Sequence, residues 1–164
     1  MKIRIIYGMV ALVLIISSSI PASAIYQQFD KSLFYKVLKQ GTLKEIDEEL
    51  ALLENASFSD RDAYLGTLQM KKSGMVKKNK EKIDLFKSGR IKLETIISAN
   101  RNNTEYRFLR LIIQEHVPKQ TKYQSQQKED SDFIRKNFSN LPANVQEIVK
   151  DYSLSSTNLK STDF

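Results

Sequence analysis

The sequence predicts an all-α protein of about seven helices, and three features of the 164-residue chain support this prediction. Apolar residues recur three and four positions apart, the spacing that places them on one face of a helix. The five Gly and three Pro fall mostly between these runs. The chain contains no Asn-Gly or Asp-Gly pair and no sustained alternation of apolar and polar residues, the patterns typical of β-hairpins. The helices are expected to form a helical-hairpin array or an irregular bundle.

Residues 1–24 are predicted to be a secretory signal peptide. Lys2 and Arg4 precede the apolar stretch 5–16, and Ala22-Ser23-Ala24 supplies the small-residue cleavage site. A membrane anchor is the alternative, but a span needs about 20 apolar residues and this stretch is shorter. We therefore expect export to the periplasm or the extracellular space. The chain has no Cys, which excludes a lipid anchor attached through Cys.

The first three helices are predicted from their boundaries. An apolar face over residues 30–39 ends at Gly41, a residue typical of helix termini. The second helix is expected to begin at Thr42. Thr42 and Glu45 have the spacing of a capping box, in which each side chain binds the other residue's backbone N–H. The third helix is expected over residues 59–73, with two acidic side chains in its first turn, where the helix dipole favours negative charge.

The next two helices are expected over residues 79–98 and 104–116. Ser88-Gly89 in the middle of the first can bend or break it. Thr104 is expected to cap the second, which Pro118 closes. Residues 104–116 are apolar nearly all round, and this predicts a helix at the centre of the core.

The last third of the chain is expected to hold two more helices. Residues 119–127 are polar and predicted to form a loop, followed by a helix over residues 128–138. Pro142 suits the first position of the final helix. Residues 153–164 are rich in Ser and Thr and are predicted to be a flexible tail. The single helical domain would therefore span residues 25–152.

Two segments within residues 60–117 resemble tetratricopeptide-type helical hairpins. Tyr64-Leu65-Gly66 places a small residue inside a helix, where that repeat keeps one for close helix packing. Residues 96–106 resemble the turn that leads from one repeat into the next, but Arg101 stands where the repeat has Pro. The distance from Gly66 to Arg101 also exceeds what the 34-residue period allows, so residues 71–82 would be an insertion. The resemblance implies binding of a protein or peptide on a concave surface, and a generic bundle is the alternative.

Two other segments resemble small exported bacterial helical proteins with no assigned activity. The first is Phe108-Leu109-Arg110-Leu111-Ile112 followed by Pro118. The second is Leu141-Pro142 ahead of Asp151-Tyr152-Ser153. This resemblance implies no mechanism.

The composition excludes several kinds of site. Without Cys, the chain cannot form disulfides or a Cys-ligated zinc or iron–sulfur site, and one His cannot build a multi-His metal site. His116 is expected to act as a cation at a helix C-terminus and not as a catalytic base. We therefore expect no cofactor, no metal and no catalytic residue. A carboxylate-based hydrolase is an alternative, although no particular pair of acids can be named.

The strongest local charge is basic. Residues 71–92 hold nine Lys and Arg against two acidic residues, while residues 45–62 hold seven acids against one Arg. The basic residues can line a solvated helix face, pair with the acidic segment, or bind an anionic membrane or polymer. The candidate basic surface comprises Lys71, Lys72, Lys77, Lys78, Lys80 and Lys82. Nucleic acid is a poor fit, because stacking aromatics are not interleaved with these lysines.

Two arginines and a tyrosine are the candidate partner-binding residues. Arg107 and Arg110 are three positions apart, so they share a helix face and could hold a carboxylate together. Tyr106 lies beside them. The alternative is that both arginines pair with carboxylates of neighbouring helices. The sequence therefore favours a non-enzymatic binder of a protein or peptide, with the basic surface and the hydrolase as alternatives.

Overall fold

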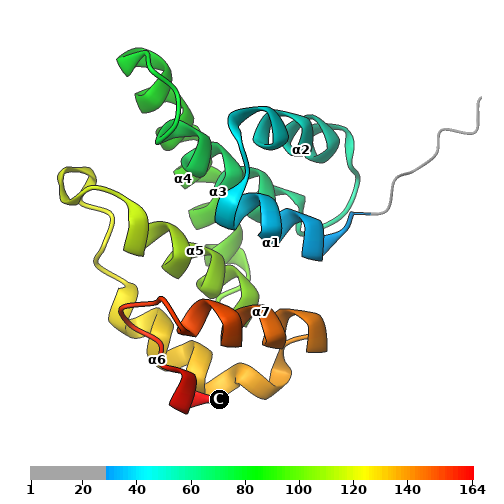
Figure 1. The fold of residues 1–164 in the computed structure, drawn as a ribbon, viewed down its shortest axis with the longest axis vertical. Helices are drawn as coiled ribbons and strands as arrows, with labels where there is room; N and C mark the ends of the chain where they lie inside the picture. Colours follow the sequence, from blue (N-terminus) through cyan, green and yellow to red (C-terminus); the bar gives the residue numbers. More distant parts are fainter. Residues whose placement is uncertain (1–28) are drawn as a thin grey trace, which may run out of the picture.

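The computed structural model describes residues 29–164, which form seven α-helices and no strand (Figure 1). The predicted signal peptide lies outside the described residues. The helices are α1 (Lys31–Gln40), α2 (Leu43–Asn55), α3 (Arg61–Ser73), α4 (Asn79–Ala99), α5 (Thr104–His116), α6 (Gln127–Asn137) and α7 (Ala143–Ser153). Three short 3₁₀ segments, Lys119–Thr121, Phe138–Asn140 and Ser161–Asp163, lie between or after them. The prediction of an all-α fold is confirmed.

Local capping fixes where several helices begin. Thr42 and Glu45 form the predicted capping box: Thr42 Oγ1 accepts from the Glu45 N–H and Glu45 Oε2 accepts from the Thr42 N–H. Asp30 caps α1 by accepting from the first-turn N–H groups. The cap of α5 is Asn103 and not Thr104 as predicted, because the Asn103 side chain reaches the Tyr106 N–H at 3.1 Å.

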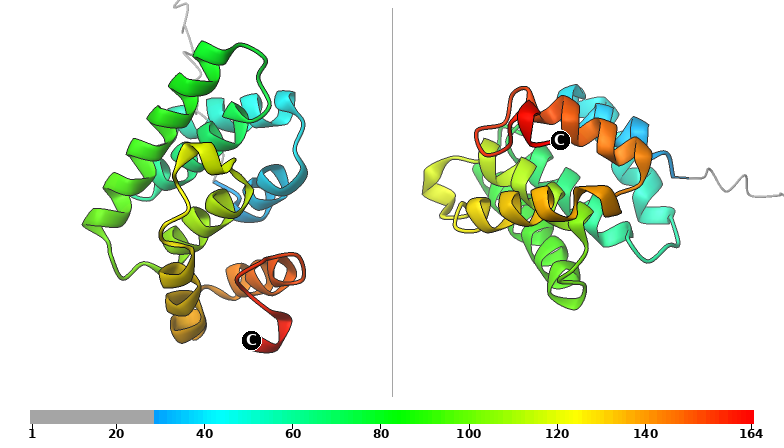
Figure 2. Two further views of the ribbon diagram at one scale, coloured as in Figure 1. Left: turned by 90° about the vertical axis from the view of Figure 1, so that its left-hand side faces the viewer. Right: turned by 90° about the horizontal axis from the view of Figure 1, so that it is seen from below.

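Helices α3 and α4 form a long antiparallel hairpin whose tip projects from the rest of the molecule (Figures 1 and 2). The two helices contact each other more extensively than any other pair of described helices. Helix α4 runs without interruption through Ser88-Gly89. The glycine lies against Gly66 of α3, so here it permits close packing of two helices and not a break.

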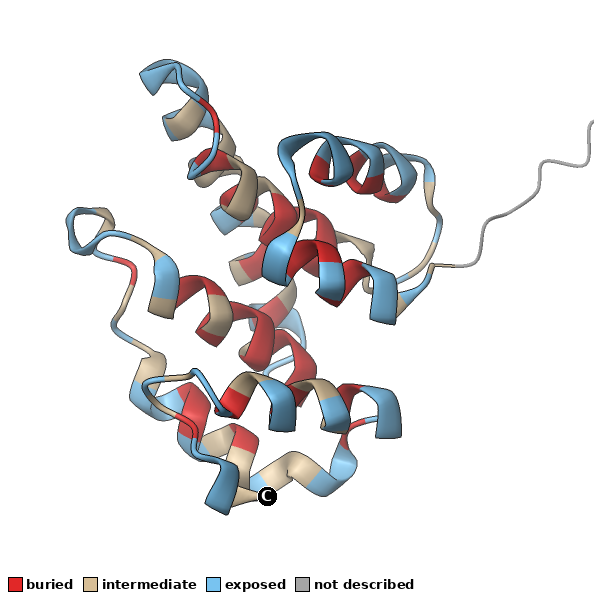
Figure 3. Ribbon diagram, in the orientation of Figure 1, coloured by how far each residue is buried: buried red, intermediate tan, exposed pale blue. Residues whose placement is uncertain are grey.

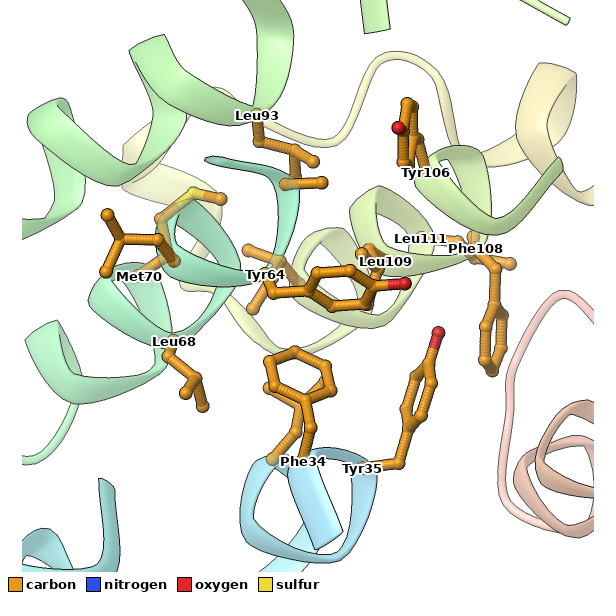
Figure 4. Close-up of a cluster of buried hydrophobic side chains, with 14 of the residues drawn as sticks. Phe34, Tyr35, Tyr64, Leu68, Met70, Leu93, Tyr106, Phe108, Leu109 and Leu111 are labelled. Carbon is orange, nitrogen blue, oxygen red and sulfur yellow. The ribbon is translucent and has the colours of Figure 1, made fainter. Parts of the chain in front are cut away.

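Helix α5 lies at the centre of the core, as its apolar sequence predicts (Figure 3). Phe108, Leu109 and Leu111 are fully buried. Its buried Glu105 joins three helices, accepting hydrogen bonds from the hydroxyls of Tyr35 in α1 (3.2 Å) and Tyr64 in α3 (2.8 Å). Figure 4 shows these two hydroxyls turned toward the same place. Lys31 pairs with the same carboxylate at 2.7 Å, so the buried charge is compensated.

The prediction of a flexible C-terminal tail is wrong. Leu159 is 1% exposed, and the Phe164 ring packs 4.5 Å from the Phe138 ring. Glu115 Oε1, at the end of α5, accepts hydrogen bonds from the side chains of Ser156, Thr157 and Asn158 and from the Asn158 N–H. Residues 154–164 therefore belong to the folded domain, because their polar side chains bind one acceptor far away in the sequence.

Candidate binding groove

The predicted arginine pair does hold a carboxylate, but that carboxylate belongs to the chain itself. Arg110 donates through Nε and Nη2 to the two oxygens of Asp130 in α6, both at 2.7 Å. Its Nη1 donates to Glu94 of α4 at 2.9 Å. Asp130 is fully buried and the Arg110 side chain is 7% exposed. Arg110 thus fastens α5 to α4 and α6 with the bidentate geometry that guanidinium groups favour.

The other two candidate residues are also engaged within the fold. Arg107 donates to Glu129 (2.8 Å) and Asp130 (3.1 Å), and its guanidinium lies 4.3 Å from the centre of the Phe133 ring. Tyr106 is 3% exposed. The alternative weighed from the sequence, pairing of both arginines with carboxylates of neighbouring helices, is the arrangement that the structure has. These three residues offer a partner little free surface.

The lysines of the candidate basic surface lie in three different parts of the fold. Lys72 pairs with Asp47 of α2 at 2.7 Å, the one ion pair between the basic and acidic segments among residues 29–164. Lys80 pairs with Asp84 within α4. Lys77, Lys78 and Lys82 lie at the hairpin tip, and none of them forms an ion pair with another described residue. Lys71 lies apart from these, on a groove described next.

A groove of about 380 Å³ lies between α1, α5 and α7. Its apolar lining combines Leu38 of α1, Phe108, Ile112 and Ile113 of α5, and Ile148 and Tyr152 of α7. Three of these side chains (Ile112, Ile148 and Tyr152) are only partly buried, so they present apolar surface to solvent. The Tyr35 and Phe108 rings, 5.9 Å apart, lie side by side beneath it (Figure 4). The volume falls in the usual range for ligand sites, about 300–1,000 Å³.

Charged side chains surround this apolar floor. Lys39 of α1 and Asp151 of α7 form an ion pair of 2.6 Å, with both side chains more than half exposed. Lys36 and Lys71 also line the groove, and neither forms an ion pair with another described residue. His116 lines it as well, and its Nδ1 lies 2.8 Å from the Ile112 carbonyl oxygen.

The acidic side chains of the groove are few. Asp151 is its one carboxylate and is held by Lys39, so the groove does not present the two facing acids that a carboxylate hydrolase needs. Within residues 29–164, no three His, Asp or Glu side chains gather as a metal site. The groove therefore combines an apolar floor with a cationic rim.

Comparison with known protein families, curated proteins and solved structures finds no match. The tetratricopeptide resemblance thus stays a prediction. Among the described helices, none has the length and apolar character needed to cross a bilayer.

Sequence reasoning did not find the groove. Ile112 and Ile148 each fall on an apolar helical stripe, and such a stripe is normally assigned to the core. A groove forms only because α1 and α7 approach α5 without closing over it. No pattern within one helix signals this, since the lining residues range from Ser32 to Ser155.

Proposed function

We propose that this chain is a non-enzymatic binding protein that seats a protein or peptide partner in the groove between α1, α5 and α7. The groove, with its partly exposed apolar floor beside α5, is the observation that carries the proposal. An apolar concavity with a few polar groups around it is the usual form of a binding site. If residues 1–24 direct export, the partner is periplasmic or extracellular.

A selection of random peptides displayed on phage against the purified protein tests this function. Recovered peptides would be titrated against the wild-type protein and the variant Ile112→Gln, with binding followed by calorimetry. We expect the variant to weaken binding at least about tenfold, because an amide in the floor opposes burial of an apolar side chain. Ile91→Gln is the matched control, since Ile91 is 66% exposed on α4 and does not line the groove.

Two results would overturn the proposal. One is a selection that recovers no peptide. The other is a set of peptides whose affinity is unchanged by Ile112→Gln, which would place their site elsewhere. Circular dichroism of both variants checks that each retains the wild-type helix content.

The hairpin tip supports a second candidate function, binding to an anionic membrane or polymer. At the tip, Lys77 and Lys78 are exposed next to Met75 (38% exposed) and Ile83 (51% exposed). Figure 3 shows the projecting tip as mostly exposed. Lysines with apolar side chains among them suit a negatively charged lipid surface.

Co-sedimentation with vesicles separates this candidate from the first. Binding to anionic vesicles, absent with neutral ones and falling steeply as salt rises, would favour the tip. The double variant Lys77→Gln/Lys78→Gln should then bind fewer vesicles while its affinity for groove peptides stays unchanged. Equal sedimentation with neutral and anionic vesicles would contradict it.

A further inference from the structure

We propose that the groove between α1, α5 and α7 selects peptide segments in which an apolar side chain lies next to a carboxylate. The apolar side chain would occupy the floor formed by α5 and α7, and the carboxylate would bind Lys36 and Lys71. This inference rests on the proposed function and names the chemistry of the partner.

The charge balance of the groove supports an anionic group in the partner. Three lysines and one aspartate line it, and the aspartate, Asp151, is paired with Lys39. Lys36 and Lys71 remain, and neither has an ion-pair partner within residues 29–164. A carboxylate arriving there gains two ammonium groups beside an apolar surface, where ion pairs are screened less than in open solvent.

The position of Lys36 argues for recognition over helix stabilisation. Lysines near a helix C-terminus interact favourably with the helix dipole, which accounts for Lys39 in the last turn of α1 and Lys71 in the last turn of α3. Lys36 lies in the middle of α1, where that effect has faded. Hydrogen bonds from Thr42 are the main cause that lowers the pKa of Glu45, and the Lys36 charge helps to lower it, but Lys36 and Glu45 form no ion pair.

Polar side chains on the same groove favour a peptide over a fatty acid as the occupant. Ser32 and Gln40 line the groove, and their side chains make no hydrogen bond with another described residue. They can therefore bind the backbone amides of a peptide. An alkyl chain would bury these groups without partners, which costs free energy.

Capped peptides with a central Phe test the inference directly. In one probe the Phe is flanked by Glu, in a second by Gln and in a third by Lys, and dodecanoate serves as the lipid probe. We expect the Glu peptide to bind about five- to tenfold more tightly than the Gln peptide, because two partly exposed ion pairs are gained. The Lys peptide should bind most weakly.

The double variant Lys36→Gln/Lys71→Gln should remove the preference for Glu and leave the affinity for the Gln peptide unchanged. The matched control, Lys77→Gln/Lys78→Gln, alters two lysines of the hairpin tip that do not line the groove and should keep the preference. Because all four side chains are without ion-pair partners among the described residues, loss of fold is not expected, and circular dichroism checks it.

The possible failures are distinguishable. Equal affinity for the Glu and Gln peptides would overturn the carboxylate inference, while the proposed function would stand. If dodecanoate binds more tightly than every peptide and displaces each of them, the choice of a peptide as occupant would be overturned. Binding of none of the peptides would count against the inference and the proposed function together.

Discussion

Gly66 of α3 and Gly89 of α4 face each other where the two helices cross. A Cβ atom built on Gly89 would lie 2.4 Å from the Gly66 carbonyl oxygen, and one built on Gly66 would lie 2.6 Å from the Gly89 carbonyl oxygen. Both distances are shorter than non-bonded contact permits, and the opposing atoms are backbone. The crossing of α3 and α4 therefore depends on the missing side chains.

Gly89→Ala should destabilise the protein despite the better helix propensity of Ala. The added methyl group forces the helices apart, and overpacking of this kind costs about 1–3 kcal/mol. Urea denaturation followed by circular dichroism measures the loss. Gly74→Ala is the control, because a Cβ there meets its nearest atom at an ordinary 3.5 Å and the backbone of Gly74 suits Ala, so stability should stay equal or rise by at most about 1 kcal/mol. Equal stability of the two variants would contradict close contact at the crossing.

Asp130→Ala should strongly destabilise the domain. Asp130 is fully buried and binds both Arg107 and Arg110, so its removal leaves Arg110 buried without its bidentate partner. Breaking a buried pair in this way costs about 3–5 kcal/mol. In Asp132→Ala, which removes an exposed partner of Lys128 and Arg135, the midpoint of urea denaturation should barely move. A small effect of both substitutions would argue against a structural role for the arginine pair.

Leu159→Ala tests whether the C-terminal residues belong to the core. Leu159 is 1% exposed, and truncation of a buried leucine costs about 2–5 kcal/mol. Leu154→Ala removes the same atoms from a side chain that is 75% exposed, so its thermal midpoint should match that of the wild type. If both variants melt at the wild-type temperature, residues 154–164 do not contribute to the fold.

Acid should weaken the hydrogen bonds that hold residues 154–164 to Glu115 at the end of α5. Burial alone would raise the pKa of Glu115, but hydrogen bonds from Tyr152, Asn158, Ser156 and Thr157 outweigh burial and lower the pKa below its ordinary value of 4.5. The carboxylate therefore contributes stability above about pH 4.5, and this contribution is lost as the pH falls through the lowered pKa.

The variant Glu115→Gln isolates that contribution, because its side chain does not titrate. The protection factors of the amides of residues 154–164, taken against the intrinsic exchange rate at each pH, should fall more steeply below about pH 4.5 in the wild type than in the variant. Parallel curves for the two proteins would show that Glu115 does not govern the attachment.

The sequence alone determined the helices of this protein, because the forces that form them act over a few residues. The Thr42–Glu45 capping box, the apolar faces and the helix ends all follow from neighbours in the chain. The central position of α5 was also predicted from its apolar residues, whereas the burial of its Glu105 and Arg110 depends on partners in other helices. The spacing of Arg107 and Arg110 indicated that they could hold a carboxylate together, and left open whether it would belong to a partner or to a neighbouring helix.

The tertiary structure determined which side chains from distant parts of the sequence contact one another. Arg110 binds Asp130, 20 residues later, and Glu115 binds Asn158, 43 residues later. Gly89 could equally have marked a break in α4 until the position of Gly66 was known. The groove likewise depends on how α1 and α7 approach α5, which no local pattern encodes. Contacts between distant segments depend on shape and packing over the whole chain, so they appear only once the helices are assembled.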